Sequence, residues 1–275
     1  MDMTIAAKGR RFQDLHYAEE ILLLPNPWDR GTTRLLEHLG FDAVATTSAG
    51  FANAQGLPDG AVTKTASLSH AADIAGATSL PVSADLENCY SHEPEGVAAT
   101  IAGAIETGIV GCSIEDATGD PDRPIYEFEL ALERVIAAVE AARGAEFPFT
   151  LTARAEGFLY GRPDLGDAVA RLQAFATAGA SVAYAPGIKD LDSIRTLVNE
   201  VPIPVNVLAR PEFTVADLQE IGVARVSIGS GLSRAALAVF SAGAREVLEA
   251  GTFGYGLPDR VDTDFNAIFR ESIAP

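Results

Sequence analysis

The sequence predicts an α/β fold, a single (β/α)8 TIM-type barrel with an extra C-terminal helix. Short apolar runs rich in β-branched residues alternate with longer helical patterns along the 275 residues, and the apolar runs number eight. No linker, low-complexity tract or break in composition divides them. We therefore expect one barrel domain over residues 1–275, in which residues 231–275 form a C-terminal helical extension.

Each apolar run has the length and composition of a strand that is buried on both faces, as in a parallel sheet. A doubly wound open sheet is the structural alternative, but the count of eight and the absence of a GxGxxG motif after the first run favour the barrel. The runs are ILLLP (21–25), DAVATTS (42–48), LPVSAD (80–85), IVGCSIED (109–116), FTLTARAE (149–156), SVAYAP (181–186), PVNVL (204–208) and RVSIGS (225–230).

Segments between the runs place apolar residues at helical spacing, and many of them end at glycine. Residues 231–250, GLSRAALAVFSAGAREVLEA, are the longest helical pattern after the last run, and a further short helix is expected around Phe265 to Ser272. The earlier helical segments are GTTRLLEHLG, TASLSHAADIAGA, GVAATIAGAIETG, FELALERVIAAVEAARG, DLGDAVARLQAFATAGA and LDSIRTLVNEV.

Composition excludes several classes of protein. No apolar run approaches the roughly 20 residues that span a bilayer, and the first residues lack the apolar core of a secretory signal, so we expect a cytoplasmic protein. Cys89 and Cys112 are too few for a disulfide framework and are expected to be reduced thiols.

Charge narrows the choice of partners. Thirty-eight acids against twenty Lys and Arg leave a formal net charge of −18, which repels phosphate backbones and anionic lipid. We therefore expect neither nucleic acid nor membrane as a partner. A site for an anionic substrate must oppose this background locally with a metal ion, an arginine or a nest of backbone N–H groups.

Carboxylates gather where the third and fourth predicted strands end, which in a barrel is the face that carries the chemistry. Asp85 and Glu87 have the same strand parity, and Glu115 ends the next strand along the chain. An isolated pair of this kind is more often a solvated loop start, but a third carboxylate on the neighbouring strand favours a cation site. Oxygen-only ligands suit Mg²⁺ or Mn²⁺. Asp116 has the opposite parity and should face the helices.

Other polar residues end further strands. Arg154 is expected either to pair with Glu115 or Glu156, or to bind a substrate carboxylate or phosphate, and both can hold at once. Small residues after the second strand would let backbone N–H groups approach an anion, although an ordinary turn is the alternative. LPDG (57–60) is best explained as a turn; the alternative is that it supplies another carboxylate, Asp59. Asn26, Trp28, Asn206 and Ser227 complete the polar strand ends.

An ordered set of motifs now carries a resemblance. NPWD, TTSAGFANAQGLPDG, SADLE, GCSIEDA, TARAEGF and PVNV, spread over roughly residues 10–240, resemble the isocitrate lyase and phosphoenolpyruvate mutase superfamily. Its members are (β/α)8 barrels that bind Mg²⁺ and a small 2-oxo or 2-hydroxy carboxylate, and pass through an Mg-bound enolate. They are usually tetramers with C-terminal helices exchanged between subunits. The resemblance therefore implies a small anionic acid as partner and a homo-oligomer, a dimer or a tetramer with helix exchange.

The resemblance also implies roles for the matching residues. Asp85 would be the direct metal ligand, with Glu87, Glu115 and Asp59 holding metal-bound waters. Arg154 would pair with substrate oxygens and, with Glu115, would take part in catalysis. The remaining implied substrate-binding residues are Ser48, Ala49 and Gly50, which would contact the substrate carboxylate together with Asp85, and Trp28 and Asn206, which would line the pocket.

Two departures from the family pattern bear on function. The family usually has DxD where this chain has Asp85-Leu86-Glu87. Lyases of isocitrate and methylisocitrate carry a KKCGH or KRCGH segment whose thiol is the catalytic acid, whereas the corresponding gating loop, 117–126 in this chain, has neither Cys nor His. Its polar candidates are Thr118, which we take as the third catalytic candidate, and Asp120, Asp122 and Arg123; Gly119, Pro121 and Pro124 suggest a hinged segment.

The cysteines and histidines outside this loop are not expected to replace that thiol as the catalytic acid. Cys112 should face the helices, and Cys89 shares the parity of Asp85 but is better explained as a buried inert thiol. His16, His38 and His70 fall in helical patterns remote from strand ends and are expected to be structural; His92 is the histidine closest in sequence to the third strand end.

Three functions remain open. The first is an Mg-dependent carbon–carbon lyase or decarboxylase acting on an acid of the oxaloacetate, malate or isocitrate type. The second is phosphorus–carbon chemistry on phosphonopyruvate, by a mutase or a hydrolase with the same metal. The third is a non-catalytic barrel that binds a 2-oxo acid, which the bare gating loop favours.

Overall fold

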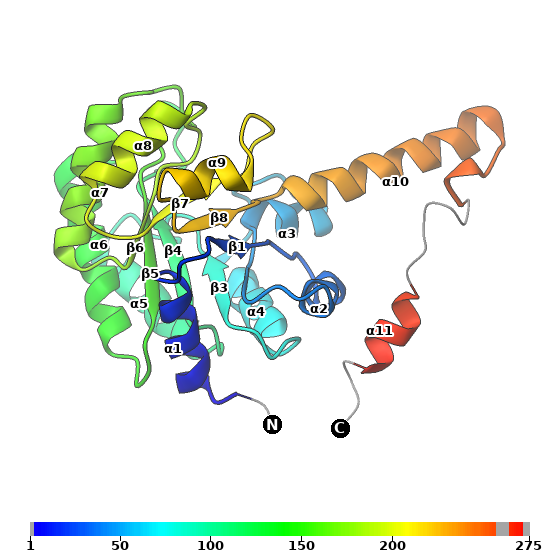
Figure 1. The fold of residues 1–275 in the computed structure, drawn as a ribbon, viewed down its shortest axis with the longest axis horizontal. Coiled ribbons are helices and arrows are strands. Elements are labelled where there is room, and N and C mark those ends of the chain that lie inside the picture. The colour runs from blue at the N-terminus through cyan, green and yellow to red at the C-terminus, as the bar shows by residue number, and fades with distance from the viewer. Residues whose placement is uncertain (1–2, 257–263, 272–275) are drawn as a thin grey trace.

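Eight parallel strands form the barrel in the computed structural model, which describes residues 3–256 and 264–271 (Figure 1). They follow the order β1-β8-β7-β6-β5-β4-β3-β2, and the Ala45 N–H donates to Pro25 C=O at 3.0 Å, joining the two ends of the sheet. All eight predicted strands are confirmed, each within its predicted run. Their bounds are β1 Leu22–Leu24, β2 Val44–Ala45, β3 Val82–Asp85, β4 Gly111–Glu115, β5 Thr150–Arg154, β6 Val182–Tyr184, β7 Val205–Leu208 and β8 Arg225–Ser227.

Asn26 reinforces the closure of the barrel at its carboxyl end. Its side-chain Nδ2 donates to Thr46 C=O at 2.9 Å, and its Oδ1 accepts from the backbone N–H groups of Ile228 and Gly229 at 2.9 and 2.8 Å. One buried amide thus satisfies backbone groups that lie just after β2 and β8, where short strands leave few ladder hydrogen bonds.

Helices surround the barrel, and every predicted helical pattern is confirmed. The six patterns between strands correspond to α2 (Arg30–His38), α4 (Lys64–Ala75), α5 (Pro94–Ile105), α6 (Phe128–Arg143), α7 (Leu165–Ala178) and α8 (Leu191–Glu200). Three other helices were not among the predicted segments: α1 (Ile5–Leu15), where only the position of His16 was recognised as helical, and the short helices α3 (Ser48–Ala54) and α9 (Val215–Glu220).

Helix α1 covers the amino-terminal end of the barrel. Phe12 is fully buried, and a Cβ on Gly111, the first residue of β4, would lie 3.1 Å from the Phe12 ring. Gly9 lies so close to Pro148, just before β5, that a Cβ there would clash with its carbonyl. The opposite, carboxyl end is left open for a site.

The strands turn one set of side chains toward the helices and the other into the barrel. Cys112, Ile114, Leu151 and Ala153 belong to the large apolar core shared with the helices. Cys112 is fully buried, as its parity predicted. Residues of the other parity, such as Ser113 and Thr152, point into the barrel, so this alternation along each strand decides which side chains reach the site.

The C-terminal part of the chain leaves the barrel. Helix α10 (Gly231–Ala250) extends away from it, and a short 3₁₀ turn, η1 (Gly254–Gly256), comes next (Figure 1). The predicted short helix is confirmed as α11 (Phe265–Glu271), near α2, while Ser272 lies outside the described residues. α10 exposes Val239 by 70% and Phe240 by 73%. The single domain and the exchange of residues 231–275 between subunits remain predictions.

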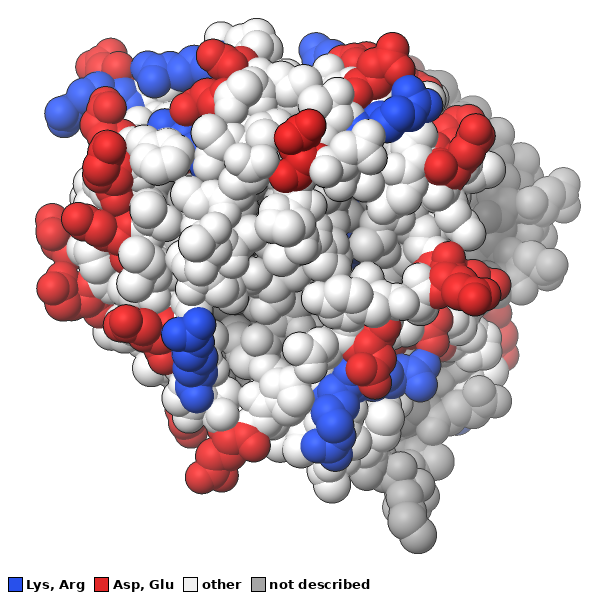
Figure 2. Space-filling model, turned by 60° about the vertical axis from the view of Figure 1, so that its left-hand side comes forward, with Lys and Arg blue, Asp and Glu red and all other residues white. Residues whose placement is uncertain are grey.

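Acidic side chains predominate among the charged residues on the face shown in Figure 2, mostly around its periphery, in keeping with the net charge of −18. Among the described residues, no helix has both the length and the apolar character needed to cross a membrane.

Candidate active site

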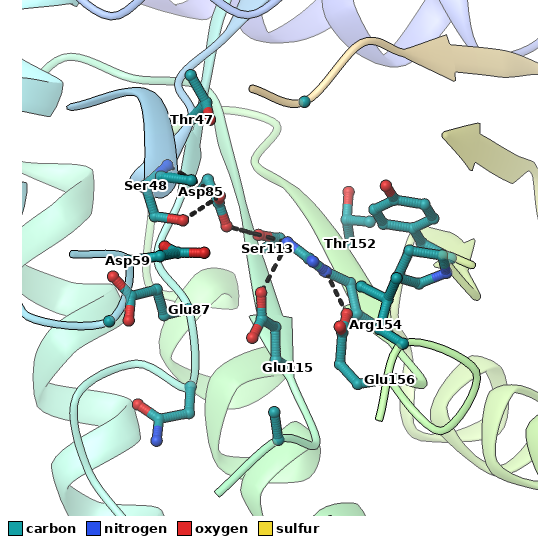
Figure 3. A pocket seen from close by; sticks show the side chains of 18 of the residues that line it. Thr47, Ser48, Asp59, Asp85, Glu87, Ser113, Glu115, Thr152, Arg154 and Glu156 are labelled. Carbon is teal, nitrogen blue, oxygen red and sulfur yellow. Dashed lines mark hydrogen bonds and ion pairs between the residues drawn. The ribbon is translucent and has the colours of Figure 1, made fainter. Parts of the chain in front are cut away.

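A cavity of about 800 Å³ opens at the carboxyl ends of the strands (Figure 3). Most of the residues predicted for the site line it, namely Ser48, Ala49, Asp59, Asp85, Glu87, Glu115, Thr118, Arg154 and Asn206. Trp28 and Gly50 are not among the lining residues. The structure therefore brings together nine of the eleven predicted residues from segments far apart in the chain.

Asp85 ends β3 and is held by four donors. Its Oδ2 accepts from the Ser48 backbone N–H at 3.1 Å and from the Ser48 hydroxyl at 2.8 Å. Its Oδ1 accepts from Arg154 Nη1 at 3.0 Å and from the Ser113 hydroxyl at 3.2 Å. The Asp85 backbone N–H donates to Thr46 Oγ1 at 2.9 Å. This carboxylate is consequently fixed in one orientation at the centre of the cavity.

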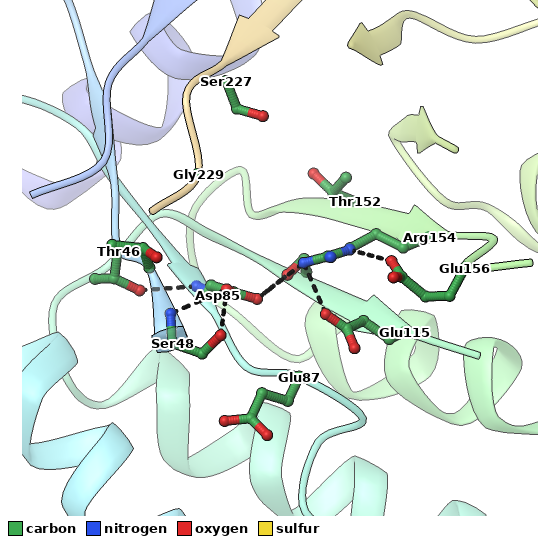
Figure 4. A network of polar contacts seen from close by, with 12 residues as sticks. Thr46, Ser48, Asp85, Glu87, Glu115, Thr152, Arg154, Glu156, Ser227 and Gly229 are labelled. Atoms are coloured by element: carbon green, nitrogen blue, oxygen red, sulfur yellow. Dashed lines mark hydrogen bonds and ion pairs between the residues drawn. The ribbon is translucent and has the colours of Figure 1, made fainter. Parts of the chain in front are cut away.

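Arg154 links the carboxylates of three segments, as Figure 4 shows in one continuous chain of contacts. Its Nη1 contacts Asp85 and, at 2.8 Å, Glu115, while its Nε donates to Glu156 at 2.7 Å. Burial alone would lower the pKa of Arg154, but the surrounding carboxylates raise it well above its ordinary value. The predicted pairing with Glu115 and Glu156 is confirmed. Among the described residues, the contacts of Arg154 with carboxylates run through its Nε and Nη1, and none joins its Nη2 to a protein acceptor.

The chain leaves β3 differently from the prediction. The strand ends at Asp85, and Glu87, Cys89 and Tyr90 have positive φ values of 51°, 57° and 56°. The continued strand assumed in the parity argument for Glu87 is therefore wrong, and the parity that Cys89 shares with Asp85 does not bring its thiol to the cavity, in keeping with the buried thiol that was expected. Glu87 still lines the cavity, because a left-handed turn rather than a continued strand brings it there.

Arg134, from α6, holds this turn in place. Its guanidinium donates to three backbone carbonyls, those of Asn88, Ser91 and Glu115, and lies 4.0 Å from the Tyr126 ring centroid. Its side chain is 1% exposed. Positive φ in non-glycine residues persists only where surrounding contacts impose it. A buried arginine thus connects the end of β4 with the turn that carries Glu87.

Cys89 is not the missing acid. Its side chain is fully buried in the apolar core, and burial raises the pKa of the thiol to about 12. Burial likewise raises the pKa of Cys112 well above its ordinary value. Both cysteines are packing residues, as predicted.

The carboxylates of the cavity repel one another. Burial, together with Asp85 and Asp59, raises the pKa of Glu87 to about 7. Burial and Asp85 also raise the pKa of Asp59. Burial raises the pKa of Glu115 well above its ordinary value, although Arg154 opposes this shift. The cavity therefore contains more carboxylate than its arginines compensate, and a bound cation would relieve it.

Asp116 faces the helices, as its parity predicted. It is 2% exposed, its Oδ1 accepts from the Glu156 backbone N–H at 2.7 Å, and its Oδ2 lies 3.3 Å from Arg171 Nη1 of α7. This contact fixes the backbone of Glu156, whose side chain in turn anchors Arg154.

The residues after β2 begin a helix rather than an open nest. Thr47 is the N-cap of α3, with its Oγ1 accepting from the Gly50 N–H at 3.2 Å, and Ser48 donates to Asp85. A Cβ on Gly50 would lie 2.6 Å from the Thr47 methyl group and 3.4 Å from Trp28 Cβ. Gly50 and Trp28 thus pack behind the cavity wall, and Ser48 and Ala49 form the wall itself.

The gating loop 117–126 forms a small antiparallel hairpin in which Ala117 pairs with Ile125. The Thr118 hydroxyl donates to Arg123 C=O at 2.6 Å, and the Thr118 C=O accepts from Asn88 Nδ2 at 3.3 Å. Ala117 to Pro121 line the cavity. The Thr118 side chain therefore holds the loop in shape while its residue borders the site.

Two of the three histidines expected to be structural, His70 and His16, pack inside the protein, whereas His38 is exposed at the end of α2. His70 stacks on Phe51 with ring centroids 3.8 Å apart, and His16 is buried near the barrel floor. His92 lines the cavity, and its Nδ1 lies 2.6 Å from the Tyr126 hydroxyl, at the end of the gating loop. His92 is thus the histidine that the fold brings to the site.

The donor set fits a hard divalent cation. Among the described residues, no group of three His, Cys, Asp or Glu side chains is arranged to hold a metal directly. Mg²⁺ commonly keeps several waters and binds through one or two carboxylates, and the oriented Asp85 with Glu87, Glu115 and Asp59 around it suits that arrangement. These residues are the ones that would hold Mg²⁺ or Mn²⁺.

Several residues that line the cavity have no sequence-based prediction. Glu156 was predicted only as a partner for Arg154, and Tyr90, Tyr160, Tyr184, Thr152 and Arg225 were missed. Thr152 and Arg225 each lie two residues before a polar strand end that was recognised, so strand parity was the signal that could have found them. The tyrosines lie in turns or end apolar strands, where no local pattern marks them.

Comparisons with known proteins identify relatives of the chain. The family model for phosphoenolpyruvate phosphomutase matches residues 12–248. An uncharacterized protein of Mycobacterium tuberculosis strain H37Rv is 32% identical over 249 residues, 90% of this chain and 92% of the relative. The 2-methylisocitrate lyase of Escherichia coli strain K12 is 27% identical over 235 residues, 81% of this chain and 78% of that enzyme.

Solved structures with a similar fold agree with the family match. A "putative lyase/mutase" from Burkholderia cenocepacia J2315 is 47% identical, with a TM-score of 0.93 over 98% of this chain and 97% of that one. Phosphonopyruvate hydrolase in complex with oxalate and Mg²⁺ is 20% identical, with a TM-score of 0.84 over 96% and 94% of the two chains, and so shares the fold. The family match and the identity to these relatives confirm the resemblance: the chain belongs to the phosphoenolpyruvate phosphomutase family, within the isocitrate lyase/PEP mutase superfamily of lyases and mutases.

Proposed function

We propose that this protein is an Mg²⁺- or Mn²⁺-dependent lyase or decarboxylase that breaks a carbon–carbon bond in a small 2-oxo or 2-hydroxy acid of the oxaloacetate, malate or isocitrate type. The observation that carries this proposal is the Arg154 cluster. One guanidinium contacts Asp85, Glu115 and Glu156, and its Nη2 is without a protein acceptor among the described residues. Such a site suits a cation on the carboxylates and an acid oxygen on the arginine.

Asp85 would be the direct metal ligand, with Glu87, Glu115 and Asp59 holding metal-bound waters. When bound, the metal would polarise the carboxylate and 2-oxygen of the acid and stabilise the negative charge that develops as the bond to C3 breaks. Burial, together with the nearby carboxylates of Asp85 and Asp59, raises the pKa of Glu87 to about 7, and this concentration of carboxylates supports the assignment.

Arg154 would orient the substrate. Glu156 anchors its Nε at 2.7 Å, so the guanidinium can release Asp85 to a metal and still present its Nη groups to an acid oxygen. Ser48 and Ala49 would contact the substrate carboxylate, and Asn206 would border it from β7. Trp28 and Gly50 would act from behind this wall, by supporting α3.

The gating loop would exclude water and carry a polar group near C3. Thr118 is the candidate in the loop, with Glu115 and Arg154 as the other catalytic candidates. Because the loop has neither Cys nor His, proton transfer must use a different group from that of the lyases with a KKCGH segment.

Phosphorus–carbon chemistry on phosphonopyruvate is the second candidate. The matching family model is that of phosphoenolpyruvate phosphomutase, which favours it. The same carboxylates and Arg154 would serve a phosphonate, since both substrates are 2-oxo acids with a second anionic group.

One assay panel separates the candidates. Purified protein with Mg²⁺ is given oxaloacetate, malates, isocitrates and phosphonopyruvate, and the release of pyruvate, glyoxylate, acetate and inorganic phosphate is measured by mass spectrometry and phosphate assay. Carbon–carbon products that disappear with Asp85→Asn support the first proposal. Phosphate from phosphonopyruvate without carbon–carbon cleavage overturns it in favour of the second. Mg²⁺-dependent binding of pyruvate without turnover of any substrate indicates a binding protein.

The partner of α10 would be a second copy of this chain. The helix projects from the barrel with Val239 and Phe240 exposed, and Leu248 and Phe253 are exposed near its end. A helix of 20 residues that exposes several large apolar side chains among the described residues is typical of an interface. A dimer or a tetramer with exchange of the C-terminal extension would bury it.

A further inference from the structure

A second polar layer lies inside the barrel, beneath the residues of the cavity mouth. Ser83, Ser113, Thr152 and Arg225 each precede by two residues a polar residue at a strand end, so they point to the same side of their strands. All four are buried and line the cavity. Barrel interiors are ordinarily filled by Val, Ile and Leu at this level. A polar layer open to the cavity therefore calls for a ligand or a specific network.

Arg225 is the charged member of this layer, and it is 4% exposed. Its Nε donates to Asn206 Oδ1 at 2.8 Å, and its Nη2 donates to the Thr152 hydroxyl at 3.0 Å. Its Nη1 lies 3.0 Å from His16 Nε2. These contacts hold the guanidinium across the barrel interior from three directions.

His16 is a neutral acceptor in this arrangement. Its Nδ1 lies 2.7 Å from Phe12 C=O and must carry the proton, because a carbonyl only accepts. Its Nε2 is then free to accept from Arg225. Burial and the charge of Arg225 lower the pKa of His16 to about 3, in agreement with a neutral ring. Asn206 is likewise oriented as an acceptor, since its Nδ2 donates to Ser227 Oγ at 2.9 Å.

Arg225 therefore has hydrogen-bond partners but no counter-ion. In the described parts of the chain, residues 3–256 and 264–271, no carboxylate forms an ion pair with it. Burial lowers the pKa of Arg225 to about 9, so it stays charged at neutral pH. An arginine has five N–H groups, and three contacts to neutral acceptors leave two without a hydrogen-bond partner among the residues that the structure describes. Buried charges are ordinarily paired.

Arg154 and Arg225 are the lysine or arginine side chains that line the cavity in the described part of the chain. Arg154 is offset by three carboxylates, whereas the charge of Arg225 is uncompensated. In the view of Figure 4, Thr152 and Ser227, which border Arg225 and Asn206, lie on the side of Arg154 away from Glu87 and Glu115. The cavity thus has a side rich in carboxylates and a side that carries the unpaired charge of Arg225.

We propose that Arg225, with Thr152 and Asn206, forms the floor of a subsite for the second, remote acidic group of the substrate, a carboxylate or a phosphonate. This inference rests on the proposed function, in which the first carboxylate and the 2-oxygen are held at the mouth. The polar layer lies two residues along the strands below the residues of the cavity mouth, a separation of about 6.6 Å. A small acid with an anionic group at each end can span this distance. The subsite selects acids with two anionic groups over pyruvate.

The test measures affinity for acids that differ in the remote group. Calorimetry with Mg²⁺ compares pyruvate, oxaloacetate and phosphonopyruvate, with KM replacing Kd for any acid that is turned over. Arg225→Met should weaken binding of the two doubly anionic acids about ten- to a hundredfold and of pyruvate by less than about threefold. Arg225→Lys should restore part of the loss. Comparison of the affinities for phosphonopyruvate and oxaloacetate shows whether the subsite prefers a phosphonate or a carboxylate as the remote group.

Asn206→Asp is the companion variant and does not depend on removing a buried arginine. The new carboxylate would lie beside Arg225 Nε and supply the missing counter-ion. We expect unchanged or higher resistance to urea, with a loss of the preference for doubly anionic acids over pyruvate. Circular dichroism checks that each variant is folded. If Arg225→Met does not fold, Asn206→Asp alone tests whether the subsite exists.

The outcomes separate the two proposals. If the wild-type protein binds pyruvate and the doubly anionic acids, and the variants lose affinity for all three equally or for none, the subsite is wrong and the proposed function stands. Wild-type protein that binds no 2-oxo acid with Mg²⁺ refutes the proposed function, and the subsite with it.

Discussion

Arg154 Nη1 lies 3.0 Å from Asp85 Oδ1, so that a guanidinium from β5 occupies one side of the carboxylate that ends β3. The other oxygen of Asp85 is held by Ser48. A divalent cation at Asp85 must therefore compete with Arg154, and the competition links metal binding to the position of the substrate-binding arginine.

Asp85→Asn should abolish stabilisation by metal. At Mg²⁺ of about 100 times Kd, wild-type protein should gain about 2.7 kcal/mol, a rise in Tm of about 5–10 °C, because metal binds only the folded state. The variant should show no shift in differential scanning fluorimetry. Asp122→Asn, on the exposed part of the gating loop, is the matched control and should behave as wild type. A full shift in Asp85→Asn would contradict the assignment of the ligand.

Glu87 should contribute through water rather than by direct ligation. Glu87→Gln should weaken Mg²⁺ binding about 10- to 100-fold, as loss of an outer partner does. Glu87→Asp should weaken it by less than about tenfold, because the carboxylate is kept and Asp tolerates the φ of 51°. Titration calorimetry with Mg²⁺ measures both. Equal affinity of Glu87→Gln and wild type would exclude Glu87 from the metal site.

Arg134 should stabilise the fold and order the turn after β3. Arg134→Met removes a buried guanidinium and leaves three partly buried carbonyls without their donor, and it should cost about 2–4 kcal/mol in urea unfolding. Hydrogen exchange should rise in residues 86–91. Arg143→Met, at the exposed C-terminal end of the same helix, should change stability by less than about 0.5 kcal/mol. Unchanged exchange in 86–91 would show that the positive φ values are maintained by other contacts.

His16 should make the protein less stable in mild acid. Its pKa is about 3 in the fold against an ordinary value of 6.5. Between these values the unfolded chain binds a proton that the folded protein does not, so stability falls as pH drops below 6.5. Relative to His16→Gln, wild-type protein should lose about 2 kcal/mol between pH 7 and pH 5. Urea unfolding of both proteins at the two pH values measures this, and parallel pH profiles would show that His16 is not responsible.

α10 should hold the oligomer together. Val239→Asp with Phe240→Asp should shift the protein toward monomer in light scattering after gel filtration, since a charge at a buried apolar contact is strongly unfavourable. Both side chains are more than two-thirds exposed in the monomer, so the fold itself should be unaffected. Arg245→Ala with Glu249→Ala, which removes an exposed ion pair on the same helix, is the control. A double Asp variant that keeps the wild-type mass would place the interface elsewhere.

Much of the site could be predicted because barrel geometry orders it. The strand ends Asp85, Glu115 and Arg154 come directly after apolar runs, and parallel strands bring them to one face. Asp116 and Cys112 were placed correctly by parity alone. Ser48 was found by its position after β2, although the helix that starts there was not.

Glu87 and Cys89 show where this reasoning fails. Parity holds only while a strand continues, and β3 ends at Asp85. The next residues form a left-handed turn held by Arg134, a residue more than 40 positions away on α6. The sequence around the turn cannot predict this contact, because the residue that makes it lies in another part of the chain.

The barrel, its eight strands and the acidic character of the site can be inferred from the amino-acid sequence, because apolar periodicity and strand-end chemistry are local properties. Which charges are compensated depends on the folded arrangement. Arg154 is offset by carboxylates from three segments, while Arg225 is surrounded by neutral acceptors from the end of α1, from β5 and from β7. Electrostatic balance depends on distance and burial, and these exist only once the chain is folded.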